Sequence, residues 1–119
     1  MTRIIVLFIS FLTFLNVLHA QKEDKKMKIV TLGFYNLENL FDTVDDTLIN
    51  DEEFLPGGAR SWTEDKYQEK LANMAYVISQ IGISEAKSGL SLLGVSEIEN
   101  KKVLEDLVLQ PTIKDRNYQ

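Results

Sequence analysis

Two polar clusters, each directly after an apolar run, hold the side chains of this sequence that could do chemistry. The first follows MKIVTLGFY and contains Asn36, Glu38 and Asn39, and the second follows LSLLGV and contains Glu97 in the stretch SEIEN. A hard divalent cation such as Mg²⁺ prefers a few carboxylate oxygens, with water and a substrate phosphate completing its octahedron. Glu97 and Glu38 could supply those oxygens. The Asn36 amide could donate a hydrogen bond to a phosphate oxygen without adding negative charge.

The same residue types also suit ordinary structural roles, so each candidate has a structural alternative. Asn36 could form a turn, because asparagine bonds readily to nearby backbone. Glu38 and Glu97 could be solvated acids at strand ends, since many strands end in polar residues. Glu99 and Asn100 in the same SEIEN stretch fit a surface acid at the rim of the cluster and a helix cap.

Composition narrows the chemistry further. The chain has no cysteine, and its single histidine, His19, lies near the N-terminus. Thiolate chemistry is therefore excluded, and the commonest transition-metal ligand is missing from residues 20–119. The formal net charge of −5 argues against binding nucleic acid through a broad basic surface. It does not exclude a phosphate substrate bridged by a metal, because the metal supplies positive charge.

Two strands must position the polar clusters. Residues 27–35 and 90–95 are nearly continuous in apolar character, which predicts strands buried on both faces. Side chains alternate along a strand, so Asn36 and Glu38 are predicted to share a face. By the same rule Glu97 should share a face with Val95 and Leu93, while Ile98 turns away.

Two helices are predicted between and after these strands. Thr63 is a good N-cap, Gly82 is a likely stop, and an apolar stripe recurs between them at Tyr67, Leu71, Met74, Ile78 and Ile81. Asn100 can cap a short second helix that Pro111 ends. A strand, crossover helix and second strand indicate an α/β fold with parallel strands, whose carboxyl ends meet at the edge where ligands bind.

The segment 42–60 is predicted to be a long acidic loop ending in the turn signal PGG, with Phe54, Leu55 and Trp62 available to pin its far end. A calcium loop is a poor match, since Val44 and Thr47 fail the third and sixth positions of the EF-hand template. A solvated loop near a site entrance fits better. Trp62 and Tyr67 are predicted to be core anchors rather than platforms for stacking bases.

The N-terminus predicts export. Residues 1–20 combine Arg3, an apolar run and a small residue at Ala20, which is the pattern of a secretory signal peptide, with an uncleaved anchor as the alternative. Residues 21–27 then form a charged tether. We expect a periplasmic or extracellular protein with no stable membrane association after cleavage, and the sequence leaves the oligomeric state open.

The sequence resembles the endonuclease/exonuclease/phosphatase superfamily, particularly exported bacterial members with an NLENLFD strand. The resemblance is carried by FYNLENLFD, by the acidic loop, by the spaced W, Y and KL that follow it, and by LLGVSEIEN. The resemblance covers residues 28–119. It implies a four-layer α/β sandwich, in which two packed sheets are flanked by helices. It also implies that Asn36 positions the substrate phosphate, that Glu97 is the principal Mg²⁺ ligand with catalytic importance, and that Glu38 assists in holding the metal. Mn²⁺ is an alternative ion.

The resemblance also implies parts that this sequence lacks. Members carry a catalytic histidine, an Asp–Asn pair after a glycine and a final Asp–His pair, none of which follows here. We therefore expect residues 28–119 to be the N-terminal part of a truncated domain, inactive alone. The full protein would be a metal-dependent phosphoesterase acting on phosphodiesters, with nucleic acid among its candidate substrates. The alternative is a non-enzymatic exported module that binds a cation or a protein.

Overall fold

The computed structural model describes residues 27–119. Along this part the elements are β1 (Leu32–Leu40), the short 3₁₀ turn η1 (Glu52–Phe54), α2 (Glu64–Gln80), β2 (Leu92–Ile98), α3 (Lys101–Val108) and a second 3₁₀ turn, η2 (Lys114–Arg116). The predicted signal peptide and nearly all of the predicted tether lie outside the described residues. Within residues 27–119, no helix has the length and apolar character needed to cross a membrane.

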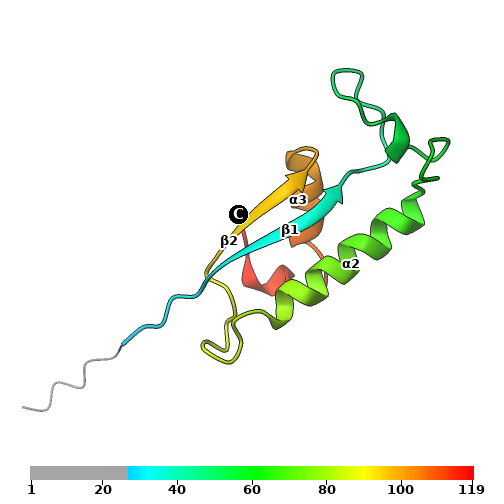
Figure 1. Ribbon diagram of the computed structural model, residues 1–119. Helices are drawn as coiled ribbons and strands as arrows, with labels where there is room; N and C mark the ends of the chain where they lie inside the picture. Colours follow the sequence, from blue (N-terminus) through cyan, green and yellow to red (C-terminus); the bar gives the residue numbers. More distant parts are fainter. Residues whose placement is uncertain (1–26) are drawn as a thin grey trace, which may run out of the picture.

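The two strands pair in parallel, as the strand–helix–strand order predicts, and form a two-stranded sheet (Figure 1). Their bounds differ from the prediction. Both strands begin later and continue through the polar clusters, because backbone pairing persists at Asn36↔Ser96 and resumes at Leu40↔Ile98. Asn36, Glu38, Asn39 and Glu97 therefore lie within the last part of each strand, and Glu99 and Asn100 follow it.

The two helices begin where their capping residues predict. The Thr63 hydroxyl accepts a hydrogen bond from the Lys66 amide, and the Asn100 side chain accepts one from the Val103 amide at 3.1 Å. After α2 the backbone turns at Gly82 with φ +75°, a conformation that glycine adopts without strain. Both predicted helix starts, and the predicted stop at Gly82, are confirmed.

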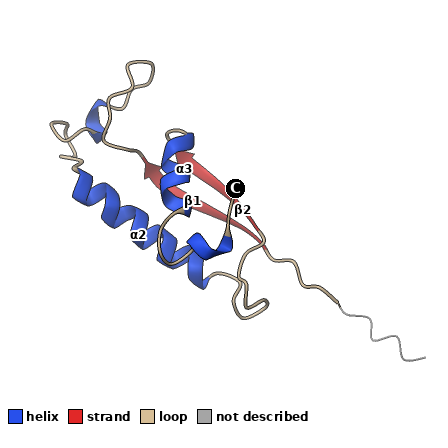
Figure 2. Ribbon diagram, turned by 180° about the vertical axis from the view of Figure 1, so that it is seen from behind, coloured by secondary structure: helices blue, strands red, loops and turns tan. Residues whose placement is uncertain are grey.

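The hydrophobic core lies on one face of the sheet only. Both α2 and α3 cover that face (Figures 1 and 2), and the buried cluster combines Leu37 and Leu40 from β1 with side chains from the helices and the C-terminal segment, namely Tyr67, Leu71, Met74, Ala75, Ile78, Val103, Leu107 and Ile113. The opposite face is open: Leu32, Phe34 and Leu92 are 69%, 71% and 64% exposed. The prediction of strands buried on both faces is therefore wrong for the described residues, because helices cover one side alone.

The long loop between β1 and α2 is pinned at its far end by aromatic side chains. Phe54 is buried and stacks on Phe41 with ring centroids 4.1 Å apart, and Trp62 meets Phe54 edge-on at 6.3 Å. The Trp62 indole N–H also donates to the Phe41 carbonyl at 3.0 Å. Trp62 and Phe54 thus serve the anchoring role predicted for them, and they fix the chain that leaves β1.

Candidate functional site

A backbone irregularity at the carboxyl end of the sheet shapes the site. Between the pairs Asn36↔Ser96 and Leu40↔Ile98, three residues of β1 stand opposite one residue of β2. Glu38, Asn39 and Glu97 in this segment have φ of 51°, 59° and 57°. Left-handed backbone costs a non-glycine residue about 1–2 kcal/mol, and such residues gather at functional sites. We call this segment, residues 37–39 with Glu97 opposite, the strand kink.

The strand kink overturns the predicted facing of β2. Ile98 does not turn away from Leu93 and Val95 but packs against the same core cluster. Glu97, predicted to share their face, is exposed instead. The reason is the left-handed conformation of Glu97, which breaks the alternation of side chains and turns its carboxylate out of the covered face.

The turned-out Glu97 carboxylate meets Asn36 from the other strand. The Asn36 amide nitrogen donates to Glu97 Oε1 at 2.7 Å, and the Asn36 amide oxygen accepts from the Glu38 backbone N–H at 2.7 Å. The second bond closes an Asx turn, so Asn36 has the turn geometry that its structural alternative predicted. It also holds a carboxylate 61 positions away. The two interpretations of Asn36 are therefore compatible.

The carboxylates of Glu38 and Glu97 are oxygen donors of the type that a hard divalent cation prefers. Within residues 27–119, no hydrogen-bond donor reaches Glu97 Oε2 or either carboxylate oxygen of Glu38, and both side chains are exposed. That part of the chain contains no group of three or more acidic, histidine or cysteine side chains placed to hold a metal. Mg²⁺ needs fewer, because it keeps several waters and is commonly bound through one or two carboxylates plus phosphate.

Lys70 on α2 belongs to the same site, and sequence analysis missed it. Its ammonium donates to the backbone carbonyls of Glu38 and of Asn39, the latter at 3.0 Å. Burial lowers the pKa of Lys70, while the nearby carboxylates of Glu38 and Glu97 act in the opposite direction. The available signal was spacing: Lys70 lies three residues after Tyr67, beside the apolar stripe of the helix.

Glu99 and Asn100 anchor the root of the acidic loop. Glu99 accepts a hydrogen bond from the Asp42 backbone N–H at 2.8 Å, and Asn100 donates to the Asp42 carboxylate at 3.4 Å. Burial raises the pKa of Glu99, and the neighbouring acid Asp42 adds to this, against the effect of the backbone hydrogen bond. Asn100 is the predicted helix cap, and the contact of Glu99 with the loop fits the predicted acid at the rim of the cluster.

The acidic loop binds its own backbone. Asp46 accepts from the Leu48 amide at 3.0 Å, and the buried Asp51 accepts from the Asp46 amide at 3.0 Å. The other carboxylate oxygen of Asp51 is buried without a partner among the described residues. The Asp46 contact is an Asx turn, and the Asp51 contact ties two parts of the loop together across five residues.

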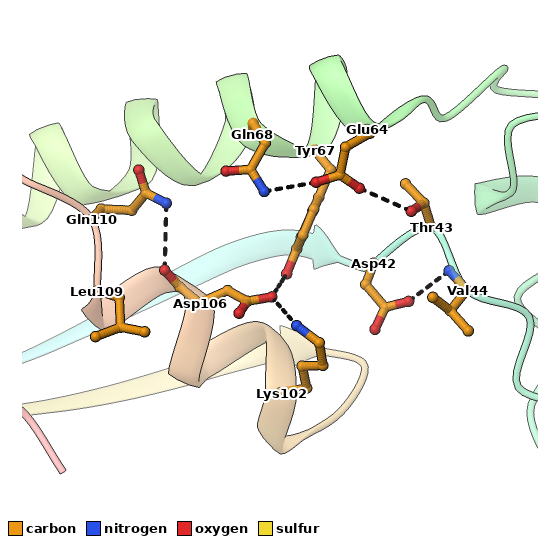
Figure 3. A pocket seen from close by; sticks show the side chains of 10 residues that line it. All are labelled: Asp42, Thr43, Val44, Glu64, Tyr67, Gln68, Lys102, Asp106, Leu109 and Gln110. Atoms are coloured by element: carbon orange, nitrogen blue, oxygen red, sulfur yellow. Dashed lines mark hydrogen bonds and ion pairs between the residues drawn. The ribbon is translucent and has the colours of Figure 1, made fainter.

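A polar cavity of about 330 Å³ lies between the start of α2 and α3 (Figure 3). Its carboxylates already have donors: Asp106 accepts from Tyr67 at 2.9 Å and from Lys102 at 2.6 Å, and Glu64 accepts from Gln68 at 2.8 Å. Burial, with the hydrogen bond to Asp106 adding to it, raises the pKa of the Tyr67 hydroxyl. Neither Asn36 nor Glu97 lines this cavity, so it is separate from the strand kink.

The parallel strands bring an amide, that of Asn36, and a carboxylate, that of Glu97, together at the carboxyl edge of an α/β sheet, which is the edge where open α/β folds generally bind ligands. A family model described as "Endonuclease/Exonuclease/phosphatase family" matches residues 31–119, and the chain belongs to this family. No curated protein and no solved structure matches the chain. Family membership indicates a phosphodiesterase or nuclease-like hydrolase acting on phosphoesters, and enzymes of the family generally use divalent metal ions.

Proposed function

We propose that this protein takes part in the metal-dependent hydrolysis of phosphate esters, with phosphodiesters as the preferred class and nucleic acid among the candidate substrates. Glu97 is the main ligand for Mg²⁺ or Mn²⁺, Glu38 assists it, and Asn36 positions the phosphate. The observation that supports the proposal is the 2.7 Å contact between Asn36 and Glu97, which joins the two strands at the carboxyl edge of the sheet.

The hydrogen bonds around Asn36 leave two groups without a partner in the described residues, namely its second N–H and Glu97 Oε2, and the proposed function uses both. An asparagine amide has two N–H donors, and one of them goes to Glu97 Oε1. The second N–H is left to donate to a phosphate oxygen. The same bond orients Glu97 so that Oε2 remains for a cation. A bound divalent ion would neutralise charge on the phosphoryl and leaving oxygens.

Hydrolysis also needs a general acid and a general base, and Asn36, Glu38 and Glu97 do not supply them in this proposal. Residues 20–119 contain no histidine, and the exposed Glu38 and Glu97 are assigned to the metal. We therefore propose that the chain alone binds the ion but has little or no phosphodiesterase activity, since general acid–base catalysis contributes about 10²–10⁴-fold. Turnover of a chromogenic phosphodiester by the purified chain, lost on Glu97→Ala, would contradict this part of the proposal.

The open face of the sheet suits the larger architecture of the family. Leu32, Phe34 and Leu92 form an apolar stripe on that face. We propose that a second sheet packs against it, giving the four-layer sandwich expected from the resemblance. We also propose that the protein belongs to the exported NLENLFD-type subgroup and acts in the periplasm or outside the cell.

A Mn²⁺ titration followed by electron paramagnetic resonance tests the metal site. We expect the chain to bind Mn²⁺ and Glu97→Gln to weaken binding by at least about tenfold, which corresponds to 1.4 kcal/mol. The matched control is Glu105→Gln, an exposed acid on α3 that pairs with Lys101 at 2.8 Å. It should leave the affinity within about twofold. Equal loss in both variants, or no loss in Glu97→Gln, overturns the assignment of Glu97.

A further inference from the structure

The contacts of Lys70 differ from those of the two lysines at the start of α3, and they reach two carbonyls where Lys66 on the same helix reaches one. Lys101 and Lys102 pair with acids one helical turn away on α3. The Lys70 ammonium instead reaches from α2 to two consecutive backbone carbonyls of β1, those of Glu38 and Asn39. It also lies 5.6 Å from the centroid of the Trp62 ring. An ammonium group with three donors can bridge two carbonyls in this way.

The two carbonyls belong to the residues that make the strand kink. Glu38 and Asn39 are both left-handed, a backbone conformation that is costly for residues other than glycine, so a contact that favours it lowers this cost. Within the described residues, Lys70 is the side chain whose hydrogen bonds reach both of them. A charge-assisted hydrogen bond is about twice as strong as a neutral one. The ammonium therefore favours this backbone conformation over a regular extended strand.

The contacts form a continuous path from Lys70 to Glu97. Lys70 holds the Glu38 carbonyl, the Glu38 N–H holds the Asn36 amide oxygen, and the Asn36 amide nitrogen holds Glu97. If the strand kink relaxed to regular β geometry, the Glu38 N–H would no longer point at the Asn36 side chain. The Asn36 amide would then lose the bond that fixes its rotation.

We propose that Lys70 is a positioning residue, which fixes the strand kink so that the Asn36 amide faces the Glu97 carboxylate. The importance of this role for metal and phosphate binding rests on the proposed function. The geometric role itself stands on contacts within the chain and can be measured without a metal.

The test uses the ¹⁵N-labelled chain and the side-chain NH₂ resonances of Asn36, which Asn36→Ala identifies by their disappearance. Lys70→Met removes the ammonium and keeps much of the apolar stem. We expect it to shift the Asn36 NH₂ resonances toward the values of a free amide and to weaken Mn²⁺ binding by about tenfold. Lys70→Arg, which keeps a charged donor that can reach carbonyls, should retain the native Asn36 resonances.

Lys66→Met is the matched control. Lys66 lies one turn earlier on α2 and also donates to a backbone carbonyl, that of Arg60 at 3.0 Å, away from the strand kink. It should leave both the Asn36 resonances and the Mn²⁺ affinity unchanged. Unchanged Asn36 resonances in folded Lys70→Met overturn the proposal, as do equal shifts in Lys66→Met.

Two further outcomes are also decisive. If Lys70→Met does not fold, Lys70→Arg decides: native Asn36 resonances support the proposal, and free-amide resonances overturn it. If the wild-type chain binds no Mn²⁺, the metal assignment fails, but a metal-free shift confined to Lys70→Met still supports the positioning role. Failure of the two proposals is therefore distinguishable.

Discussion

The two faces of the β1–β2 sheet carry different residues. On the covered face, the pair Tyr35↔Val95 packs against the helices, and Leu37 and Leu40 are fully buried. On the open face, the pairs are Leu32↔Leu92, Phe34↔Gly94 and finally Asn36↔Ser96. The covered face holds the packing that stabilises the described fold. The open face leads along an apolar stripe to the candidate site.

At the strand kink the regular alternation of side chains along β2 is broken, so that Glu97 and Ile98 each lie on the face opposite to the one that alternation predicts. Regular alternation would place Glu97 with Val95 on the covered face, where a carboxylate without partners would be costly to bury. The left-handed backbone at Glu97 puts the carboxylate on the exposed side beside Asn36, while Ile98 returns to the core. Stability and ligand binding should therefore respond to substitutions on different faces.

The largest expected effect is a difference in unfolding free energy between substitutions on the two sides of the sheet. Leu71→Ala removes a fully buried side chain of α2 from the core that packs on the covered face and should lower the free energy of unfolding by about 2–5 kcal/mol. Phe34→Ala on the open face should change it by about 0.5 kcal/mol or less, since Phe34 is mostly exposed. Urea unfolding of both variants measures this. Comparable losses would show that the open face is packed in solution.

The next effect concerns ligand binding on the open side. Asn36→Ala removes the amide that orients Glu97, and loss of such a supporting contact weakens metal binding by about 10–100-fold. The unfolding free energy should change little, because Asn36 is exposed. Mn²⁺ affinity and urea unfolding, measured on the same sample, check both parts. A large stability loss with unchanged affinity would assign Asn36 to the fold alone.

A smaller effect is expected from the covered side. Tyr67→Phe removes the hydroxyl that donates to Asp106 at 2.9 Å and leaves Asp106 paired with Lys102. Loss of this hydrogen bond should destabilise the chain by about 1 kcal/mol. Mn²⁺ affinity should not change, because the polar cavity and the strand kink are separate. A shift in affinity would show that the two regions are coupled.

The smallest effect is a pH dependence at the root of the acidic loop. Burial raises the pKa of Glu99 above its ordinary value of 4.5, so the folded chain binds the Glu99 proton more tightly than the unfolded chain. The stability contributed by protonated Glu99 is present below pH 4.5 and is lost as the pH rises through the folded pKa. Glu99→Gln should therefore be more stable than wild type at pH 7, with the difference shrinking on acidification. Urea midpoints at several pH values measure it.

Local features made α2 and α3 predictable. Thr63, Asn100 and Gly82 act on backbone within a few residues of themselves, so capping rules locate the helix ends without knowledge of the rest of the fold. The apolar stripe from Tyr67 to Ile78 likewise reports the covered side of α2. The family resemblance, carried by the strand-end motifs, agrees with the family match.

The strand ends could not be predicted in the same way. Left-handed φ at Glu38, Asn39 and Glu97 depends on bonds to residues more than 30 positions away, which strand periodicity does not contain. Alternation therefore placed Ile98 on the wrong face. The role of Lys70 could not be predicted from the sequence, because a lysine on a helix is usually a solvated charge. Its contacts with the carbonyls of Glu38 and Asn39 depend on how α2 packs beside β1.

One measurement tests the shared site of Asn36 and Glu97 most directly: paramagnetic broadening by Mn²⁺ in the ¹⁵N-labelled chain. We predict that substoichiometric Mn²⁺ broadens first the Asn36 side-chain amide and the backbone amides of Glu38 and Glu97. Broadening centred instead on the acidic loop, residues 42–53, would contradict the proposed site and favour a cation-binding module.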